Sequence, residues 1–490
     1  MQFLVTQRIL GLLLISFSFT LLPPMGVSLW YQDNWLKVFL VAFLVMFGVG
    51  MAFWFQARHA KKELHLHDGF VIMVMFWIVL SVVGALPFLL PSLFFPDLIF
   101  PKLSIAQAVF EAVSGFTTTG ATVISGLDNL SKSILYYRQQ LQWLGGLGVI
   151  VLAVAMLPML GIGGMQLYRA ETPGPMRDEK LTPRLQNTAK TLLSIYIILT
   201  VACALAYWMA GMPLFDAIGH SYSTVATGGF STRDASLGYY NSPIIEIIAM
   251  IFIILGSLNF TVHFVAWRKL DIHHYWHDIQ GRVFIYIVLV LIAITVVVLL
   301  WQGVYTSFWT ALRYGSFEVI SIISSTGYAT ADFSGWPLFL PVLILGSGFI
   351  GGCVGSTAGG FRVIRFILLY KQALREIMRL IHPNAVIAVK IGHQKISDNV
   401  AQAVWGFIFL YMASYVFLSM LFIATGVDYL TAFSGVAATL NMTGPGLGNV
   451  AVTYGGINDA GLWILSFAML LARLEIFTLL VLLTPAFWRR

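Results

Sequence analysis

The sequence predicts an all-α polytopic membrane protein, built from four repeats of helix, short helix, turn and helix, with an extra helix pair before them. Three observations predict this class: an apolar composition, long uncharged runs and a fourfold internal repeat. Of the 490 residues, 59% are hydrophobic and 10% are charged, whereas soluble domains carry about 25% charged residues. So few charges cannot cover a surface that faces water, which excludes a soluble enzyme, a coiled coil and a disordered regulator.

Membrane crossings are predicted from runs of about 20 apolar residues, the length that spans a hydrocarbon core of ~30 Å. Such runs cover residues 9–32, 38–57, 69–96, 139–168, 191–215, 247–267, 283–312, 333–361, 399–427, 429–458 and 460–488. Four apolar segments are too short to cross, at 104–116, 215–226, 308–324 and 428–441. We therefore expect about ten full crossings and four re-entrant segments.

The positions of lysine and arginine predict the orientation, because cytoplasmic loops are enriched in both. With both termini cytoplasmic, 21 of the 28 lysine and arginine residues fall on the inner side. The net charge of +7 therefore reflects membrane topology and does not indicate a nucleic-acid partner. The two cysteines, Cys203 and Cys353, lie far apart in apolar runs and provide neither a disulfide framework nor a zinc site.

The four short segments align on one glycine each. They read FEAVSGFTTTG, IGHSYSTVATG, FEVISIISSTG and SGVAATLNMTG. Each ends in a Thr-Gly dipeptide after a half-length apolar segment, and four such matches indicate a functional repeat rather than chance. The chain then divides into an N-terminal helix pair (1–57) and pore repeats at 68–168, 185–268, 281–375 and 398–488.

Turns of this kind at membrane depth predict a pore. Irregular backbone within the membrane is tolerated only where it is buried in protein or lines a water-filled cavity. Four such turns around a central pore would present rings of carbonyl and hydroxyl oxygens, which replace the hydration shell of a monovalent cation. Glycine admits the backbone conformations that this requires. The C-terminal ends of the short helices are partially negative, which also favours a cation.

With these turns, the chain resembles the Trk/Ktr/HKT superfamily of potassium transporters over essentially its whole length. The stretch RQQLQWLGGLGVIVLAVAMLPMLGIGGMQLYRAETPGP (138–175) is similar to the bacterial Trk membrane subunit (TrkH/TrkG type) in particular. The resemblance implies potassium uptake across the bacterial inner membrane by a homodimer, with a TrkA-type cytosolic nucleotide-binding partner and no organic cofactor on this chain. It also implies potassium sites at the filter residues Thr118, Thr119, Gly120, Ala226, Thr227, Gly228, Ser325, Thr326, Gly327, Met442, Thr443 and Gly444.

Residues GSGFIGGCVGSTAGGF (346–361) interrupt the crossing expected in the third repeat. Each glycine costs a helix about 1 kcal/mol relative to alanine, and seven occur in this stretch of 16 residues. One interpretation is close helix packing through small residues; the other is an unwound intramembrane loop under the filter. The resemblance implies a gating loop here, formed by Gly346, Gly348, Gly351, Gly352, Gly355, Gly359 and Gly360.

Three charged residues in the apolar segments, Arg473, Glu111 and Glu318, each have two interpretations. Arg473 lies deep in the last apolar run, where an arginine costs ~2.5–3.5 kcal/mol unless it faces protein or water. It forms either a structural ion pair with another helix or a pore-facing positive charge, and the resemblance implies the second, as part of the gate. Glu475 lies on nearly the opposite side of the helix and cannot easily pair with it. Glu111 and Glu318 are expected to support the filter through its backbone N–H groups; the alternative is that they are ion ligands.

Other classes of function leave weaker signals. No arrangement of catalytic residues is visible, so the chain is not expected to be an enzyme. A cation-coupled symporter of potassium with protons or sodium is the main alternative, with a site between inverted repeats; repeats that share one topology argue against it. The basic stretches 169–190 and 362–398 are expected to dock the soluble partner or to contact anionic membrane lipids. His273, His274 and His277 have near-metal spacing but are expected to form an interfacial face.

Overall fold

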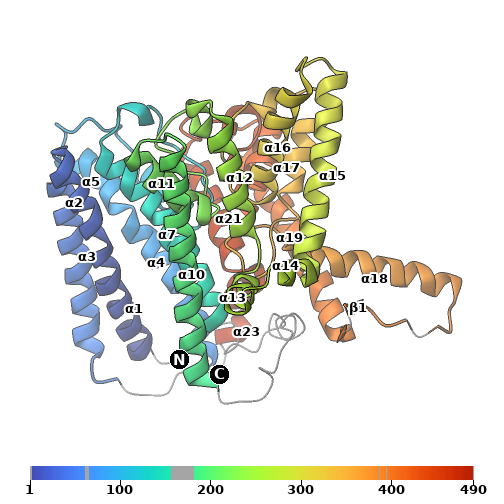
Figure 1. Cartoon of the computed structure of the whole chain (residues 1–490). Helices are drawn as coiled ribbons and strands as arrows, with labels where there is room; N and C mark the ends of the chain where they lie inside the picture. Colours follow the sequence, from blue (N-terminus) through green and yellow to red (C-terminus); the bar gives the residue numbers. More distant parts are fainter. Residues whose placement is uncertain (1–2, 61–65, 156–180, 386, 393, 489–490) are drawn as a thin grey trace.

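The computed structural model describes residues 3–60, 66–155, 181–385, 387–392 and 394–488. Within them the fold is a helical bundle, with a single two-stranded antiparallel hairpin (Figure 1). The main elements are α1 (Phe3–Ser18), α2 (Leu22–Tyr31), α3 (Leu36–Ala57), α4 (Leu66–Gly84), α5 (Leu86–Phe94), α6 (Ile105–Phe116), α7 (Lys132–Ala155), α10 (Leu181–Met209), α11 (Leu214–Val225), α12 (Pro243–Ser257), α13 (Phe260–Lys269), α14 (His273–His277), α15 (Ile279–Trp301), α16 (Phe308–Ile323), α17 (Leu340–Ser347), α18 (Val363–Ile381), β1 (Lys390–Ile391), β2 (Gln394–Lys395), α19 (Asp398–Ile423), α20 (Tyr429–Leu440), α21 (Asp459–Arg473), α22 (Ile476–Leu483) and α23 (Pro485–Trp488).

The long helices confirm a polytopic membrane protein. Six helices among the described residues are long and apolar enough to cross a bilayer, and two bent helix pairs raise the number to eight if each pair is one span. The expected crossing at 139–168 and the docking stretch 169–190 both run partly outside the described residues. The figure of about ten crossings therefore stays a prediction.

Helices α1 and α3 pack closely against each other at two glycines. A Cβ added to Gly11 of α1 would lie 2.8 Å from the carbonyl oxygen of Gly50 in α3, and a Cβ added to Gly50 would lie 3.0 Å from that of Gly11. Glycine at both positions lets the two backbones approach closely, which is the usual basis of helix contacts in membranes.

The four apolar segments that were expected to be re-entrant are short helices, α6, α11, α16 and α20. Two of these helices begin at residues whose side chains cap the helix N-terminus. Ser104 and Gln107 form a capping box at the start of α6, and the side chain of Asp428 accepts a hydrogen bond from Thr431 N–H at the start of α20. Most residues of all four helices are buried. Protein therefore encloses the irregular backbone that follows each of them.

Among the described residues, the helices that follow the second, third and fourth turns are broken. The axis bends by 99° between α12 and α13 and by 111° between α21 and α22. In the third repeat, α17 ends at Ser347 and α18 begins only at Val363, so the expected crossing at 333–361 is not one helix. Figure 1 shows α18 projecting sideways from the bundle, across the direction of its neighbours α15 and α17.

Candidate functional site: a ring of four turns

Each short helix ends in a turn with the same unusual backbone. One residue beyond the helix C-cap, φ lies between 50° and 60°; two residues further on, a glycine has φ between 79° and 83°. This left-handed region disfavours residues with a Cβ and suits glycine. Strain of this kind persists only where the surrounding structure enforces it, and it gathers at functional sites. The left-handed pairs are Thr118 and Gly120, Thr227 and Gly229, Ser325 and Gly327, and Met442 and Gly444.

The turn of the second repeat lies one residue later than the sequence alignment places it. Ala226 is the C-cap of α11 with φ −75°, which makes it the counterpart of Thr117 in the first repeat. The turn itself consists of Thr227, Gly228 and Gly229. The alignment is wrong here because it matches Thr-Gly dipeptides, and the doublet Gly228–Gly229 conceals the shift. Gly229 is thus a turn residue that the sequence analysis missed, and the second glycine of the doublet was its only signal.

Backbone hydrogen bonds confirm the corrected register. In every turn, the N–H of the middle residue donates to the carbonyl oxygen five residues earlier in the short helix. The donors and acceptors are Thr119 to Ser114 at 2.9 Å, and Gly228 to Ser223, Thr326 to Ser321 and Thr443 to Ala438 at 2.8 Å each.

The four turns close into a ring in which each repeat contacts the next. A Cβ added to the left-handed glycine of one turn would crowd the carbonyl oxygen of the middle residue in the following turn. The middle carbonyl groups of all four repeats therefore gather in one ring. Both the positive φ and this close approach require glycine. The contacts run from Gly120 to Gly228, from Gly229 to Thr326, from Gly327 to Thr443 and from Gly444 back to Thr119.

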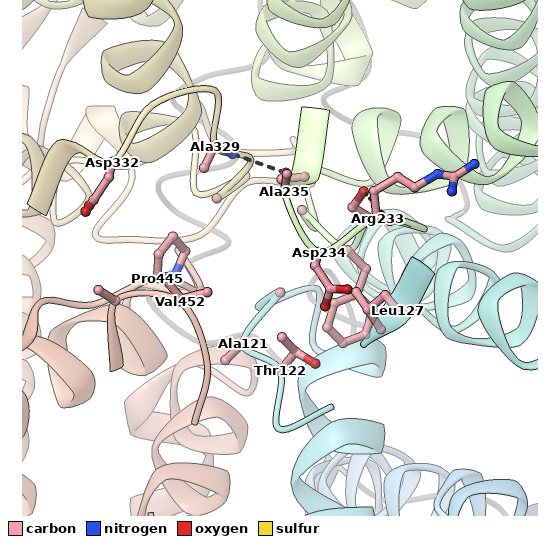
Figure 2. A pocket seen from close by; sticks show the side chains of 18 of the residues that line it. Ala121, Thr122, Leu127, Arg233, Asp234, Ala235, Ala329, Asp332, Pro445 and Val452 are labelled. Carbon is pink, nitrogen blue, oxygen red and sulfur yellow. Dashed lines mark hydrogen bonds between the residues drawn. The ribbon is translucent and has the colours of Figure 1, made fainter. Parts of the chain in front are cut away.

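A cavity of about 350 Å³ lies over one side of the ring (Figure 2). All four left-handed glycines line it. Its walls come from loops of every repeat, and they include Asp234, Asp332 and Arg233, whose guanidinium points away from the cavity toward Asp128 and Asp216. The cavity thus forms a vestibule that leads to the carbonyl ring.

Glu111 and Glu318 lie behind the turns, and both accept hydrogen bonds from backbone N–H groups. Glu111 accepts from Val123 N–H at 2.9 Å and pairs with Arg138 at 2.7 Å. Glu318 accepts from Thr330 N–H at 2.7 Å, and it forms no ion pair with a described residue. Both side chains are fully buried. The N–H groups that they hold belong to the chain just beyond each turn rather than to the turn itself.

In the other two repeats, different residues hold the chain beyond the turn. His220 occupies the glutamate position in the corrected register. Its Nδ1 lies 2.8 Å from the carbonyl oxygen of Asp216 and therefore carries the proton, so that Nε2 accepts from the Ser231 hydroxyl at 2.9 Å. In the fourth repeat, the hydroxyl oxygen of Ser434 accepts from Leu447 N–H at 2.9 Å. The sequence alignment missed His220 because the alignment of the second repeat was displaced by one residue.

The glycine-rich stretch of the third repeat is an unwound loop, residues 348–362, that lies against the ring. Gly359 N–H donates to Ser325 Oγ at 2.5 Å, and Thr357 Oγ1 donates to Val225 O at 3.1 Å. A Cβ added to Gly359 would lie 2.5 Å from the carbonyl oxygen of Asn441. The loop thus contacts the residues at which the turns begin, whereas the vestibule is lined by the glycines at which the turns end. Loop and vestibule lie on opposite sides of the ring.

Arg473 lies between the loop and the ring. Its guanidinium donates to the carbonyl oxygens of Thr357 at 3.3 Å and Gly145 at 3.2 Å, and it lies 3.8 Å from the sulfur of Met442. It forms no ion pair with a described residue, so the contacts do not support the structural ion pair. Glu475 pairs instead with Arg365, at 3.0 Å.

The three clustered histidines do not form a metal site. No group of three or more histidine, cysteine, aspartate or glutamate side chains among the described residues could hold a metal ion. Asp271 accepts a hydrogen bond from the backbone N–H of His273, and this bond together with the imidazole lowers the pKa of the carboxyl group. The exposed His273 thus has a local partner.

A ring of backbone carbonyls within a polytopic bundle, open to a vestibule on one side and covered by a loop on the other, defines a membrane transport protein. Comparisons with known proteins agree. Residues 36–490 match the TrkH family, described as a cation transport protein. The chain is 52% identical to the Trk system potassium uptake protein TrkH of Vibrio parahaemolyticus over 491 residues, which is 100% of both chains. It is 50% identical to TrkH of Escherichia coli K12, over 100% of both chains, and 42% identical to TrkG of that strain, over 99% of this chain and 98% of the other.

A solved structure extends the likeness to the fold. The crystal structure of the potassium transporter TrkH from Vibrio parahaemolyticus matches with a TM-score of 0.92 and 49% identity, over 100% of both chains. This chain belongs to the TrkH family of cation transport proteins. Family membership confirms the resemblance found in the sequence and the expectation of a transporter rather than an enzyme.

Proposed function

We propose that this chain takes up potassium across the bacterial inner membrane through the ring of four turns, as the membrane subunit of a Trk system. The observation that carries the proposal is the closed ring, in which the middle residue of every turn brings its carbonyl oxygen against the next repeat. Carbonyl oxygens replace the hydration shell of potassium, and four helix C-termini add partial negative charge. The membrane potential drives entry with ~2.3 kcal/mol per charge per 100 mV, or roughly 50-fold accumulation.

The potassium sites are proposed at three residues of each turn in the corrected register. Ala226 leaves the set and Gly229 joins it. The repeat boundaries at 68–168, 185–268, 281–375 and 398–488 belong to the same proposal. The residues are Thr118, Thr119 and Gly120; Thr227, Gly228 and Gly229; Ser325, Thr326 and Gly327; and Met442, Thr443 and Gly444.

The loop 348–362 and Arg473 act as the gate in this proposal. The loop blocks the inner side of the ring, and the positive charge of Arg473 beside it repels a cation. Glycine-rich backbone carries few side chains that would lock a single conformation. The loop continues directly into α18, which leaves the bundle (Figure 1) and can transmit the pull of a TrkA-type cytosolic nucleotide-binding subunit to the loop. The membrane subunit itself is proposed to work as a homodimer.

Rubidium uptake into vesicles with an imposed inside-negative potential, and without a proton or sodium gradient, tests the function. We expect uptake that prefers potassium and rubidium over sodium. Gly327→Ala should abolish this preference because the added Cβ meets the carbonyl oxygen of Thr443, whereas Gly335→Ala, whose Cβ would meet only Asp332 at 3.9 Å, should keep it. Absence of uptake until a proton or sodium gradient is added would contradict the proposal. That result would favour a symporter that couples potassium to protons or sodium. The relatives, which are named potassium uptake proteins, do not favour a symporter.

A further inference from the structure

The broken helix of the second repeat is capped by the loop of the third. A helix leaves its last four carbonyl groups without intrahelical partners, and within the membrane no bulk water replaces them. At the end of α12, the carbonyl oxygen of Gly256 accepts from Thr357 N–H at 3.3 Å, and that of Ser257 accepts from Cys353 N–H at 2.9 Å. Displacing the loop would leave these buried carbonyl groups unpaired. The position of the loop therefore depends on where α12 ends.

The helices α12, α13 and α14 are joined into one unit. The imidazole of His263 in α13 donates from Nε2 to the carbonyl oxygen of Leu255 in α12 at 2.9 Å, and its Nδ1 accepts from the hydroxyl of Tyr275 in α14 at 2.7 Å. At the bend, Phe260 N–H donates to the carbonyl oxygen of Gly355 in the loop at 3.1 Å. A force on α13 and α14 is thus transmitted to the loop.

The far end of this unit exposes an aromatic and basic surface. Trp267 is 60% exposed, Leu270 91% and Trp276 70%. Arg268 and Lys269 lie between them, and neither forms an ion pair with a described residue. Figure 1 places α13 and α14 toward the end of the bundle that carries α23, which the distribution of lysine and arginine assigns to the cytoplasm. Tryptophan side chains favour the headgroup level of a membrane, and basic side chains there attract anionic lipids.

We propose that the exposed surface of α13 and α14, here called the hairpin surface and formed by Trp267, Arg268, Lys269, Leu270 and Trp276, binds anionic phospholipid headgroups. This binding holds the loop 348–362 against the ring. The tryptophans and the exposed leucine favour a lipid surface over a soluble acidic protein, because indole rings and an aliphatic side chain gain from the apolar edge of the headgroup layer. A consequence for transport rests on the proposed function of the loop as gate; the binding and its effect on the loop do not.

The chain carries its own reporter for a test. Cys353 is buried within the loop, and Cys203 is the only other cysteine. In a Cys203→Ala background, the rate at which a maleimide modifies Cys353 reports how often the loop leaves its place. We would compare vesicles of phosphatidylcholine with vesicles of phosphatidylcholine and phosphatidylglycerol in equal parts. Phosphatidylglycerol should slow the modification by about five-fold or more, the effect of one basic residue at an anionic surface.

Two variants assign the effect to the hairpin surface. Arg268→Gln combined with Lys269→Gln should abolish the difference between the two vesicle types. Arg58→Gln removes an exposed positive charge next to α3, which makes no hydrogen bond to the loop, and should keep the difference. Equal modification rates in both vesicle types, or a lipid effect that survives the double substitution, would overturn the proposal. If Cys353 modification follows the lipid while rubidium uptake does not, this inference stands and the proposed gate fails.

Discussion

The hydroxyl oxygen of Ser325 accepts a hydrogen bond of 2.5 Å from the backbone N–H of Gly359. Ser325 is the first left-handed residue of the third turn, so this bond joins the ring directly to the loop. Thr357 adds a bond from its hydroxyl to Val225 O at the end of the short helix α11 and a bond from its N–H to Gly256 O at the end of α12. Ring and loop therefore form one hydrogen-bonded structure, and moving the loop requires several of these bonds to break together.

Replacing Thr357 by valine should loosen the loop. The substitution keeps the shape of the side chain but removes the hydroxyl that lies 3.1 Å from the carbonyl oxygens of both Val225 and Gly256. A hydrogen bond of this kind contributes about 1 kcal/mol, so rubidium uptake without a soluble partner should rise by about five-fold. The measurement is the initial rate of uptake at matched protein content.

Thr295→Val is the matched control for this prediction. The hydroxyl of Thr295 in α15 is also buried, but it has no hydrogen-bond partner among the described residues. The same change of atoms there should leave uptake unchanged, since no bond is lost. Equal increases in both variants would mean that the loop bonds of Thr357 do not restrain transport.

The corrected register of the second turn predicts that Gly229 is more sensitive to substitution than Gly228. The sequence alignment would predict the opposite ranking. Gly229 has φ +79°, and an added Cβ would crowd the carbonyl oxygen of Thr326. At Gly228, φ is not positive and the added Cβ would meet the end of the Gln142 side chain, which can shift only by giving up its hydrogen bonds to Gly228 O and Phe230 N–H. Gly229→Ala should therefore reduce the potassium-to-sodium preference by about ten-fold or more, the effect of a ~1.4 kcal/mol perturbation. Gly228→Ala should reduce it less, and the opposite ranking would restore the alignment.

The two buried glutamates should differ in their contribution to stability. Glu111→Gln leaves the buried Arg138 without its charge partner, and breaking a buried pair from one side costs about 3–5 kcal/mol. Glu318 has no ionic partner among the described residues, so Glu318→Gln keeps an acceptor for Thr330 N–H and should cost far less. Thermal unfolding in detergent measures both variants. Equal losses would show that the pair with Arg138 contributes little.

Substitutions of Arg473 can separate its charge from its hydrogen bonds. Arg473→Gln removes the positive charge and leaves a shorter, neutral amide, so cation flux should rise by about ten-fold for each ~1.4 kcal/mol removed from the barrier. Arg473→Lys keeps the charge and should keep the flux low. A rise of equal size in both variants would assign the restraint to the hydrogen bonds of the guanidinium.

Local patterns were sufficient to predict the short helices but not the register of every turn. The structure places α6 at Ile105–Phe116, within one residue of the expected 104–116, because an apolar half-length segment follows a capping serine. In the second repeat, the dipeptide Thr227-Gly228 matches the Thr-Gly pattern of the other repeats, and the glycine that follows it conceals the shift by one residue. Only the backbone φ angles and the contact with Thr326 reveal the shift.

Contacts between distant segments account for the rest. The pairing of Glu111 with Arg138 joins residues 27 positions apart, and neither neighbourhood in the sequence indicates the other. The bend after Ser257 carries no proline in its two linking residues; it is stabilised by N–H donors from Cys353 and Thr357, about 100 residues later. Bends of this kind depend on partners that a local pattern does not contain.

The ring of four turns belongs to one chain, and this has an evolutionary consequence. In a tetramer of identical subunits, every mutation appears four times around the axis. Here each quarter can change alone, and the quarters have already diverged: the chain beyond the turn is held by Glu111, His220, Glu318 and Ser434 in the successive repeats. Selection can therefore change ion preference one turn at a time and can restrict a moving part to one repeat. A tetramer of identical subunits cannot do this, because every change appears in all four subunits.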